Sequence, residues 1–392
     1  MKVAFSLGAS VCFILLGTSG ARAQEEPSER ALEISPVGYV EAHYAYNFNR
    51  PSNGITNFRG FDNRHNTFTL ANAAAGANAD YGPVTARLIV QVGSTPSTYY
   101  LSEPNLAGTG GTNASNAELW KYLQEANVAY KAPLGRGLLL QLGLVPSPIG
   151  LESFAIKDNW SYSRSNLFFG FPFYHTGFRA TYEWTKGLTT TVAVFNGWNS
   201  VVDDNDEKSV QADVTYESER AFLKAVYFGG VERPAGRRLL EGPAWRHTFD
   251  VVAQVRATTW LSFASEAVHG WEANRLGIAS WTATAIYARV KPLDRVYVAL
   301  RGDRFHERLA HDGSRASTPI FWNGVGWVSS GTATLDVRPH DHLSVRLEVR
   351  HDAASAPLFF RRDVRGDGSP ASPYLPNATS QNTLLLGATA WL

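Results

Sequence analysis

Apolar and polar residues alternate with a period of two over most of the chain. The alternation is cleanest in residues 342–352. The apolar face of that segment would consist of Leu343, Val345, Leu347 and Val349. Successive side chains of a β-strand point to opposite faces, so this pattern is typical of a strand that separates two unlike environments. The chain is therefore expected to be rich in strands.

About sixteen segments fit this pattern. They are residues 37–48, 66–80, 84–93, 120–131, 137–145, 173–184, 187–197, 208–217, 220–229, 247–257, 260–270, 278–290, 295–303, 325–338, 342–352 and 382–392. Segment 66–80 is rich in Ala and Asn and only weakly patterned, and segment 260–270 has no clear polar face.

The connections between these segments alternate in length. The long ones are expected at residues 49–65, 94–118, 146–172, 198–206, 230–245, 270–277, 304–324 and 353–379. Short turns fall between them. Outer-membrane barrels have short periplasmic turns, longer extracellular loops and an even number of strands, whereas soluble β-sandwiches and propellers have no reason for this regularity. We therefore predict an all-β fold, a transmembrane antiparallel β-barrel of about sixteen strands over residues 36–392.

Aromatic residues gather near both ends of the predicted strands. Those beside short turns are Tyr130, Tyr182, Trp184, Tyr216 and Tyr287. Those near long loops are Phe48, Trp198, Tyr227 and Trp271. Two aromatic belts are what anchoring at the two membrane interfaces predicts.

Residues 1–23 have the features of a secretory signal peptide. Lys2 precedes a mostly apolar stretch, and residues 21–23 form a small-x-small cleavage site. Residues 24–35 would then form a short periplasmic leader. Cys12 is the only cysteine and lies in the signal, so the exported chain would hold no disulfide.

Charge and hydropathy narrow the possibilities further. The net charge is +1, and removal of the signal, with Lys2 and Arg22 and no carboxylate, leaves −1. This balance gives no indication of nucleic-acid binding. No later apolar run approaches the roughly 18 residues that a membrane helix needs. A membrane-spanning form would be a closed barrel, because lipid tolerates no unpaired strand edge.

The polar faces of the strands would line the interior of the barrel. Candidate pore-lining residues are Glu41, Arg87, Glu125, Arg179, Asp213, Asp250, Arg256, Arg295, Arg301, Arg346, Glu348 and Arg350. Arginine outnumbers acid in this set, which would favour anions weakly. The alternative is that each charge pairs across neighbouring strands and only stabilises a wet wall.

The stretch 146–172 is long, rich in aromatics and marked by prolines. Long loops of this kind are usually functional or disordered, and its aromatic content argues against disorder. We expect it to fold toward the lumen and narrow a pore. Its candidate constriction residues are Glu152, Lys157, Asp158 and Arg164. The alternatives are ion pairing within the loop and an ordinary surface loop.

Several short motifs in and after this stretch resemble those of the OmpL-like porin family, also called β-barrel porin-2. They are Pro148-Ile149-Gly150 with Glu152, Asp158-Asn159, Tyr162-Ser163-Arg164-Ser165, Phe173-Tyr174-His175-Thr176-Gly177, Asn196-Gly197-Trp198, and Asp203-Asp204-Asn205 with Lys208-Ser209. The resemblance covers about residues 125–216. It implies a bacterial outer-membrane barrel that acts as a passive pore, and it transfers no substrate-binding residue.

Enzymatic motifs are weak in this sequence. There is no G-x-S-x-G elbow and no phosphate-binding G-x-x-x-x-G-K motif. His306, Glu307 and His311 resemble a zinc helix motif with one residue too many. The acidic run 203–207 could bind Ca²⁺ loosely, although a charged loop tip explains it as well. We therefore predict no catalytic residue, no metal site and no cofactor.

These observations favour an outer-membrane porin that lets small hydrophilic solutes or ions diffuse passively through a water-filled barrel. The alternative is a non-conducting structural or adhesion barrel of the outer membrane. The expected partners are outer-membrane lipid and the solutes. Barrels of this class commonly form trimers, so a homotrimer stays open, although the sequence carries no interface signal.

Overall fold

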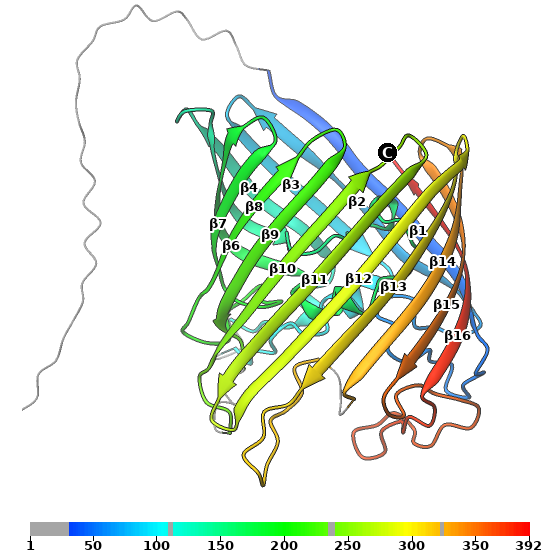
Figure 1. Ribbon diagram of the computed structural model, residues 1–392. Helices are drawn as coiled ribbons and strands as arrows, with labels where there is room; N and C mark the ends of the chain where they lie inside the picture. The colour runs from blue at the N-terminus through cyan, green and yellow to red at the C-terminus, as the bar shows by residue number, and fades with distance from the viewer. Residues whose placement is uncertain (1–30, 109–112, 234–239, 322–324) are drawn as a thin grey trace, which may run out of the picture. The chain divides into compact units, whose positions relative to one another are not determined.

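Sixteen antiparallel strands form a closed barrel in the computed structural model, which describes residues 31–108, 113–233, 240–321 and 325–392 (Figure 1). The strands are β1 (Glu33–Asn47), β2 (Thr67–Tyr81), β3 (Val84–Val92), β4 (Leu123–Ala132), β5 (Leu138–Pro146), β6 (Tyr174–Thr185), β7 (Leu188–Phe195), β8 (Ser209–Glu217), β9 (Ala221–Val231), β10 (Trp245–Arg256), β11 (Leu261–Asn274), β12 (Gly277–Leu293), β13 (Val296–Arg308), β14 (Trp327–His340), β15 (Leu343–Ala354) and β16 (Ser380–Trp391). Each pairs with its neighbours in sequence, and β1 closes the barrel against β16. The predicted fold is confirmed.

The predicted signal peptide, residues 1–23, lies outside the described residues, as does most of the predicted leader, residues 24–35. The barrel unit begins at Leu32.

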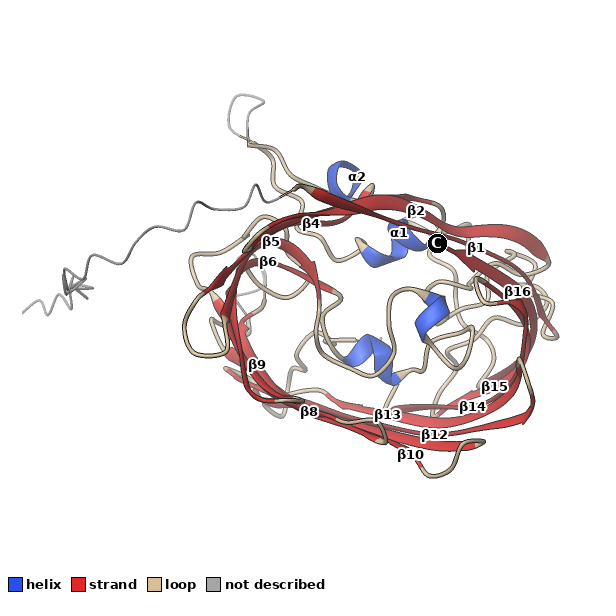
Figure 2. Cartoon of the chain, turned by 90° about the horizontal axis from the view of Figure 1, so that it is seen from above, coloured by secondary structure: helices blue, strands red, loops and turns tan. Residues whose placement is uncertain are grey.

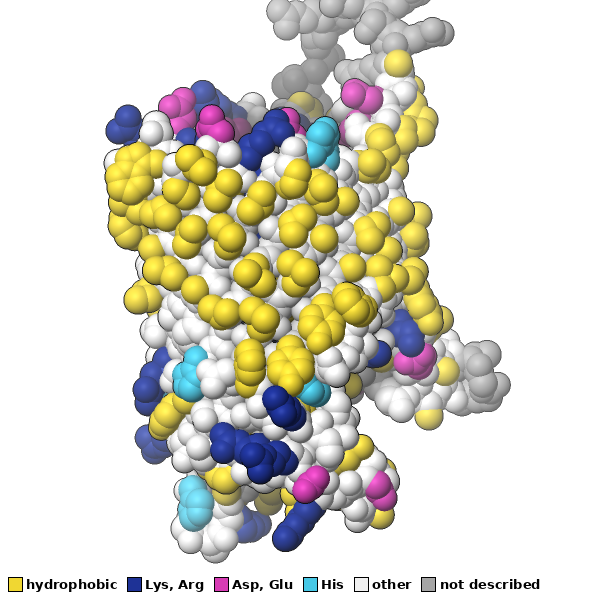
Figure 3. Space-filling view, turned by 90° about the vertical axis from the view of Figure 1, so that its right-hand side faces the viewer, with side chains coloured by type: hydrophobic (Ala, Val, Ile, Leu, Met, Phe, Trp, Pro, Cys, Tyr) yellow, Lys and Arg dark blue, Asp and Glu magenta, His cyan; other side chains and the backbone are white. Residues whose placement is uncertain are grey.

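Side chains alternate between the outer surface and the interior along the strands. On β15, Leu347 and Val349 are 45% and 51% exposed, whereas Glu348 and Arg350 are buried. On the face seen in Figure 3, the outward apolar residues form a band, with charged residues beyond both of its edges. This arrangement matches the height-limited apolar belt of a transmembrane barrel.

The long and short connections lie at opposite ends of the barrel, and the C-terminus lies at the short-turn end (Figure 1). The prediction of a long loop at residues 270–277 is wrong. Only Arg275 and Leu276 separate β11 from β12. The alternation continues past residue 270, because Glu272 is fully buried while Ile278 on the paired strand is exposed. This hairpin extends the sheet where a loop was expected.

The aromatic belts are partly as predicted. Tyr130, Trp184 and Tyr216 are exposed near the short turns, and Phe48 is exposed at the other end. The placement of Tyr287 on the outer surface is wrong, since its ring is buried inside the barrel. Trp198 also lies inside. It packs against Phe228, Trp281 and Phe321 because the connection that carries it folds inward.

Among the described residues, helical structure is confined to short turns within the connections. These are α1 (Thr95–Tyr99), α2 (Ala117–Trp120), and two 3₁₀ turns, η2 (Ile156–Asp158) and η3 (Leu167–Gly170). The view down the barrel shows α1 inside the ring of strands (Figure 2). Within the described ranges, no helix is both long enough and apolar enough to cross a bilayer.

Candidate functional site

Residues 147–173, which connect β5 to β6, fold into the barrel (Figure 2). We call them the inner loop. Apart from η2 and η3 the segment has no regular structure, yet most of its residues are buried. Buried backbone N–H and C=O groups need hydrogen-bond partners, and irregular backbone cannot supply them all itself. The partners come from the barrel wall.

Wall carboxylates accept hydrogen bonds from the N–H groups of the inner loop. Glu41 on β1 accepts from Ile156 at 2.6 Å. Glu348 on β15 accepts from Tyr162 at 2.7 Å and from Ser163 at 3.1 Å. Two further bonds join Gly150 to Asp250 at 3.1 Å and Asn166 to Asp303 at 3.0 Å. Hydrogen bonds to ionised acceptors are stronger than neutral ones, so these contacts fix the course of the loop.

Wall arginines donate hydrogen bonds to the carbonyl oxygens of the same loop. Arg301 reaches Ser163 at 2.6 Å, Arg346 reaches Ile156 at 2.9 Å and Ser161 at 3.1 Å, and Arg350 reaches Arg164 at 2.5 Å. All three guanidinium-bearing residues are at most 4% exposed. The inner loop covers these candidate pore-lining residues, as it covers Glu41, Asp250 and Glu348.

The buried arginines are paired with carboxylates. Arg301 lies 2.8 Å from Glu152 of the loop and 3.5 Å from Asp303 of its own strand. Arg350 lies 2.7 Å from Asp352. Removing charges from water is costly unless they are paired and hydrogen-bonded. The loop and the wall therefore share one buried ionic network.

Glu152 and Arg164, two of the four candidate constriction residues, are buried within the loop. Besides binding Arg301, Glu152 accepts hydrogen bonds from the N–H and the hydroxyl of Ser165 at 2.8 and 2.7 Å. Arg164 donates to the carbonyl oxygens of Tyr162 and Phe154. These two side chains hold the loop together.

Lys157 and Asp158, the other two candidates, form an ion pair of 2.8 Å. Their side chains are 29% and 50% exposed. Both line a cavity of about 210 Å³. Arg87 and Glu125 on the opposite wall line the same cavity, so the pair lies across from a second pair of charges.

That opposite wall, on β2 to β8, carries a series of hydrogen-bonded polar side chains, which we call the polar belt. Arg87 on β3 donates to Asn78 on β2 at 2.7 Å and to Glu125 on β4 at 2.7 Å. The series continues through bonds of Gln141 to Asn127, Arg179 to Gln141, Thr181 with Thr191, and Gln211 to Asp213. A wall of this composition suits water and hydrophilic solutes.

Two aromatic residues of the inner loop lie between this cavity and a second one. Phe171 and Phe173 line both. The second cavity, of about 390 Å³, opens among the long loops and is also lined by Trp198, Arg233 and Phe321. The two aromatic rings therefore border both spaces.

Other long connections brace the inner loop from the long-loop end. Phe61 contacts Phe154 and Phe168, with ring centroids 6.1 and 5.8 Å apart. Glu103 accepts a hydrogen bond from Tyr174 at 2.6 Å and another from the N–H of Val201 at 3.0 Å. Burial raises the pKa of the Glu103 carboxyl above its ordinary value.

The remaining candidate pore-lining residues lie elsewhere. Arg256 is exposed at the last residue of β10. Arg295 lies in the short turn between β12 and β13 and pairs with Asp341 at 3.0 Å. Sequence reasoning missed the neutral members of the polar belt, such as Gln141. Their position on the inward parity of the strands was the available signal.

Gly387 on β16 provides a test of how closely the inner loop fits the wall. A Cβ atom there would lie 2.2 Å from the ring of Tyr162. We expect Gly387→Val to displace Tyr162 and to cost about 1–3 kcal/mol of loop docking through overpacking. The variant should show higher conductance and a lower melting temperature. Gly331→Ala is the control, because a Cβ at Gly331 meets nothing within 4 Å. Unchanged conductance and melting temperature in Gly387→Val would contradict the docked position of Tyr162.

Comparison with known proteins identifies the family to which this barrel belongs. The OmpL-like β-barrel porin-2 family matches residues 33–391, which is nearly all of the described chain. The chain belongs to this family. It is a porin of the bacterial outer membrane, its long connections are extracellular and its short turns periplasmic. No curated protein matches the sequence.

Solved structures agree with the fold of the porin. The anion-selective porin of Comamonas acidovorans is 8% identical with a TM-score of 0.58, over 92% of this chain and 100% of that one. The outer-membrane channel DcaP of Acinetobacter baumannii is 10% identical with a TM-score of 0.55, over 92% and 97%. The trimer form of OmpT of Vibrio cholerae is 9% identical with a TM-score of 0.57, over 92% and 100%. At these identities the likeness concerns the fold.

Proposed function

We propose that this porin passes small hydrophilic solutes and ions between the polar belt and the exposed face of the inner loop. The supporting observation is the division of the lumen. One side is occupied by a loop tied to β1 and β10 to β15, and the other side is a hydrogen-bonded polar wall. Solutes would pass the rims of Phe171 and Phe173 and then the facing pairs Lys157–Asp158 and Arg87–Glu125.

The charges beside the proposed path are nearly balanced. Arg301, Arg346 and Arg350, which made arginine dominant in the sequence, are buried beneath the loop. The charged members of the polar belt are Arg87 and Arg179 with Glu125 and Asp213, two of each sign. We therefore infer weak ion selectivity, with the inner loop as the element that limits solute size.

Export and assembly complete the proposal. Residues 1–23 would direct export and be removed, and residues 24–35 would remain in the periplasm. The barrel would sit in outer-membrane lipid. A homotrimer is the oligomer we infer, in keeping with the trimer form in which OmpT of Vibrio cholerae was solved. The proposed function requires no catalytic step and no cofactor.

Planar-bilayer recording of the purified, unheated porin in a KCl gradient tests the proposal. We expect discrete conductance steps and a reversal potential close to zero, because the charges of the polar belt balance. A strong anion or cation preference would contradict the balanced path. Silence from protein that retains β-structure would instead favour a non-conducting structural or adhesion barrel.

A further inference from the structure

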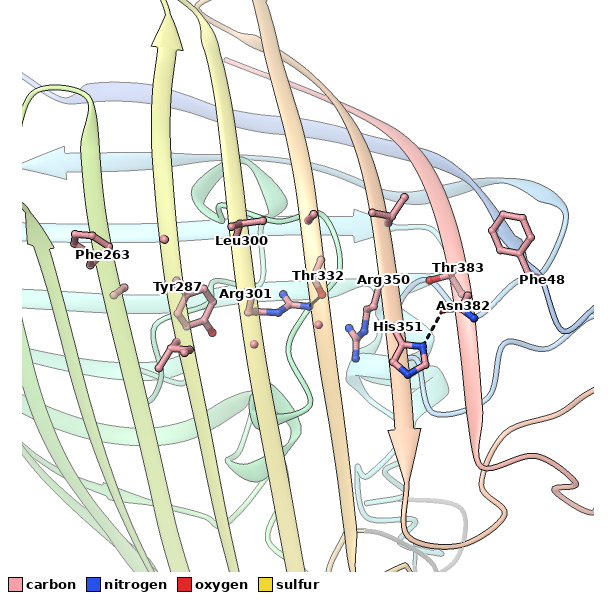
Figure 4. A pocket seen from close by; sticks show the side chains of 17 residues that line it. Phe48, Phe263, Tyr287, Leu300, Arg301, Thr332, Arg350, His351, Asn382 and Thr383 are labelled. Carbon is pink, nitrogen blue, oxygen red and sulfur yellow. Dashed lines mark hydrogen bonds between the residues drawn. The ribbon is translucent and has the colours of Figure 1, made fainter.

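The outer surface of the barrel carries a groove of about 960 Å³ across β11 to β16 (Figure 4). Its outward-facing walls include Phe263, Ile286, Leu300 and Val349, which are 47–67% exposed. The groove is separate from the pore, because these side chains point outward, whereas the buried arginines at alternate positions of β13 and β15 point inward. Its volume is at the upper end of the roughly 300–1,000 Å³ that small-molecule sites occupy.

Two glycines form the floor of the groove. Gly302 on β13 is paired in register with Gly331 on β14. A Cβ at Gly331 would meet nothing within 4 Å, and one at Gly302 would meet only Ile286, at 3.9 Å. Neither glycine has the positive φ that would require the residue for backbone reasons. The missing side chains therefore leave open space on a surface that faces lipid.

Two arginines and two histidines lie at the extracellular edge of the groove. Arg304 is the next outward residue after Gly302 on β13, roughly 7 Å further along the strand. His306 and Arg308 follow on the same face, and all three are exposed. His351, beside Gly331 on β15, is also exposed and is hydrogen-bonded to Asn382 at 2.8 Å (Figure 4).

Arg304 is oriented by its neighbours, and part of its guanidinium group is left available for hydrogen bonding. Its guanidinium lies 4.4 Å from the ring centroid of Trp327 on β14, and its Nε donates to His306 at 2.8 Å. Among the described residues its two Nη atoms have no hydrogen-bond partner. A guanidinium that is stacked and oriented in this way is suited to a phosphate, whose oxygens match its forked donors.

The carboxylates of these strands are confined to the inner face of the barrel. The carboxylates of β13 to β15 all point inward and are at most 9% exposed, namely Asp303, Glu307, Asp336, Glu348 and Asp352. None of the outward positions of β12 to β16, all within the described residues, holds a carboxylate. Figure 3 shows basic side chains and histidines beyond the extracellular edge of the apolar band on this side. An anionic partner would therefore meet no repulsion from the strands.

We propose that this groove binds one anionic, phosphate-bearing lipid of the outer leaflet. An acyl chain lies on the floor formed by Gly302 and Gly331, and the headgroup phosphate is held by Arg304, with His306 and Arg308 beside it. Apolar burial holds the chain, and basic side chains attract the charge at the membrane surface. The pairing of an apolar groove with a carboxylate-free basic edge favours a lipid over a second copy of the barrel.

Native mass spectrometry of the purified full-length porin tests this site. Phosphatidylglycerol, which is anionic, is compared with phosphatidylcholine, which has no net charge, and with a bis-phosphorylated glycolipid. We expect the two anionic lipids to bind preferentially. The double variant Arg304→Ala/Arg308→Ala should weaken their binding about tenfold or more. Gly331→Phe should prevent retention by filling the groove. The anionic lipid that binds more tightly shows whether the phosphate comes from a phospholipid or from a glycolipid.

The control is Arg220→Ala, an exposed arginine in a periplasmic turn that should leave lipid binding unchanged. Equal binding of anionic and neutral lipid, or wild-type binding by the double arginine variant, overturns the proposal. A change of oligomeric state in Gly331→Phe also overturns it, since the groove would then be a contact between copies. Should Gly331→Phe fail to fold, the exposed arginines decide the question by themselves.

Discussion

Replacement of residues 150–168 by a short Gly-Ser linker is expected to raise single-channel conductance several-fold. The inner loop occupies the side of the lumen against β10 to β16 and β1, and a barrel of this strand number without an inserted loop encloses an aqueous channel. Removal would also expose wall charges that now bind the loop, including Glu348 and Arg350. Conductance in 1 M KCl and the size of the largest permeant sugar both measure the effect.

The matched control is deletion of residues 366–371. These residues are mostly exposed and belong to the connection between β15 and β16. Conductance should not change, because this segment lies outside the proposed path. A barrel that folds without residues 150–168 and conducts like the wild type would show that the loop is not the constriction.

Arg301→Leu is expected to release the inner loop by breaking its central ion pairs. Without the guanidinium, Glu152 and Asp303 are left as buried charges lacking their cation, and such a loss typically costs about 3–5 kcal/mol. The cost falls on docking of the loop, so we expect faster amide exchange over residues 150–168 and a lower melting temperature. Hydrogen exchange with mass spectrometry, together with heat-modifiable gel mobility, measures both.

Arg295→Leu is the control for Arg301→Leu. It also removes an arginine from an ion pair, with Asp341 at 3.0 Å, but both side chains are more than half exposed. Exposed pairs contribute about 0–1 kcal/mol, so little should change. The double variant Arg301→Leu/Glu152→Leu should be less destabilised than the sum of its single variants. Additive losses would mean that the two side chains do not act as a pair.

Strand number and side-chain parity follow from the sequence because they depend on local alternation. On β15 the inward and outward sets are those that residues 342–352 predict. Parity fixes the face of a side chain but not its partner. Arg87 and Arg301 have the same parity, yet one faces the open lumen and the other lies beneath the inner loop.

The buried network could not be predicted, because it depends on where a distant segment folds. Glu348 and Tyr162 are 186 residues apart in the chain. The errors have local causes. Tyr287 occupies an inward position of β12. It was assigned to the outer surface only because it was expected near the end of the strand. The hairpin between β11 and β12 is longer than expected, because the alternation of its residues continues beyond the point where a membrane strand usually ends.

The inner loop also bridges the line along which the barrel closes. Ile156 is bound by Glu41 of the first strand, while Tyr162 is bound by Glu348 of β15 and covers Gly387 of the last strand. These anchoring groups come together only after β1 has met β16. Docking of the loop is therefore a late step of assembly. Once docked, the loop holds β1 and β16 together by contacts on both sides of the line where they pair. A porin whose loop is released should open first between its two terminal strands.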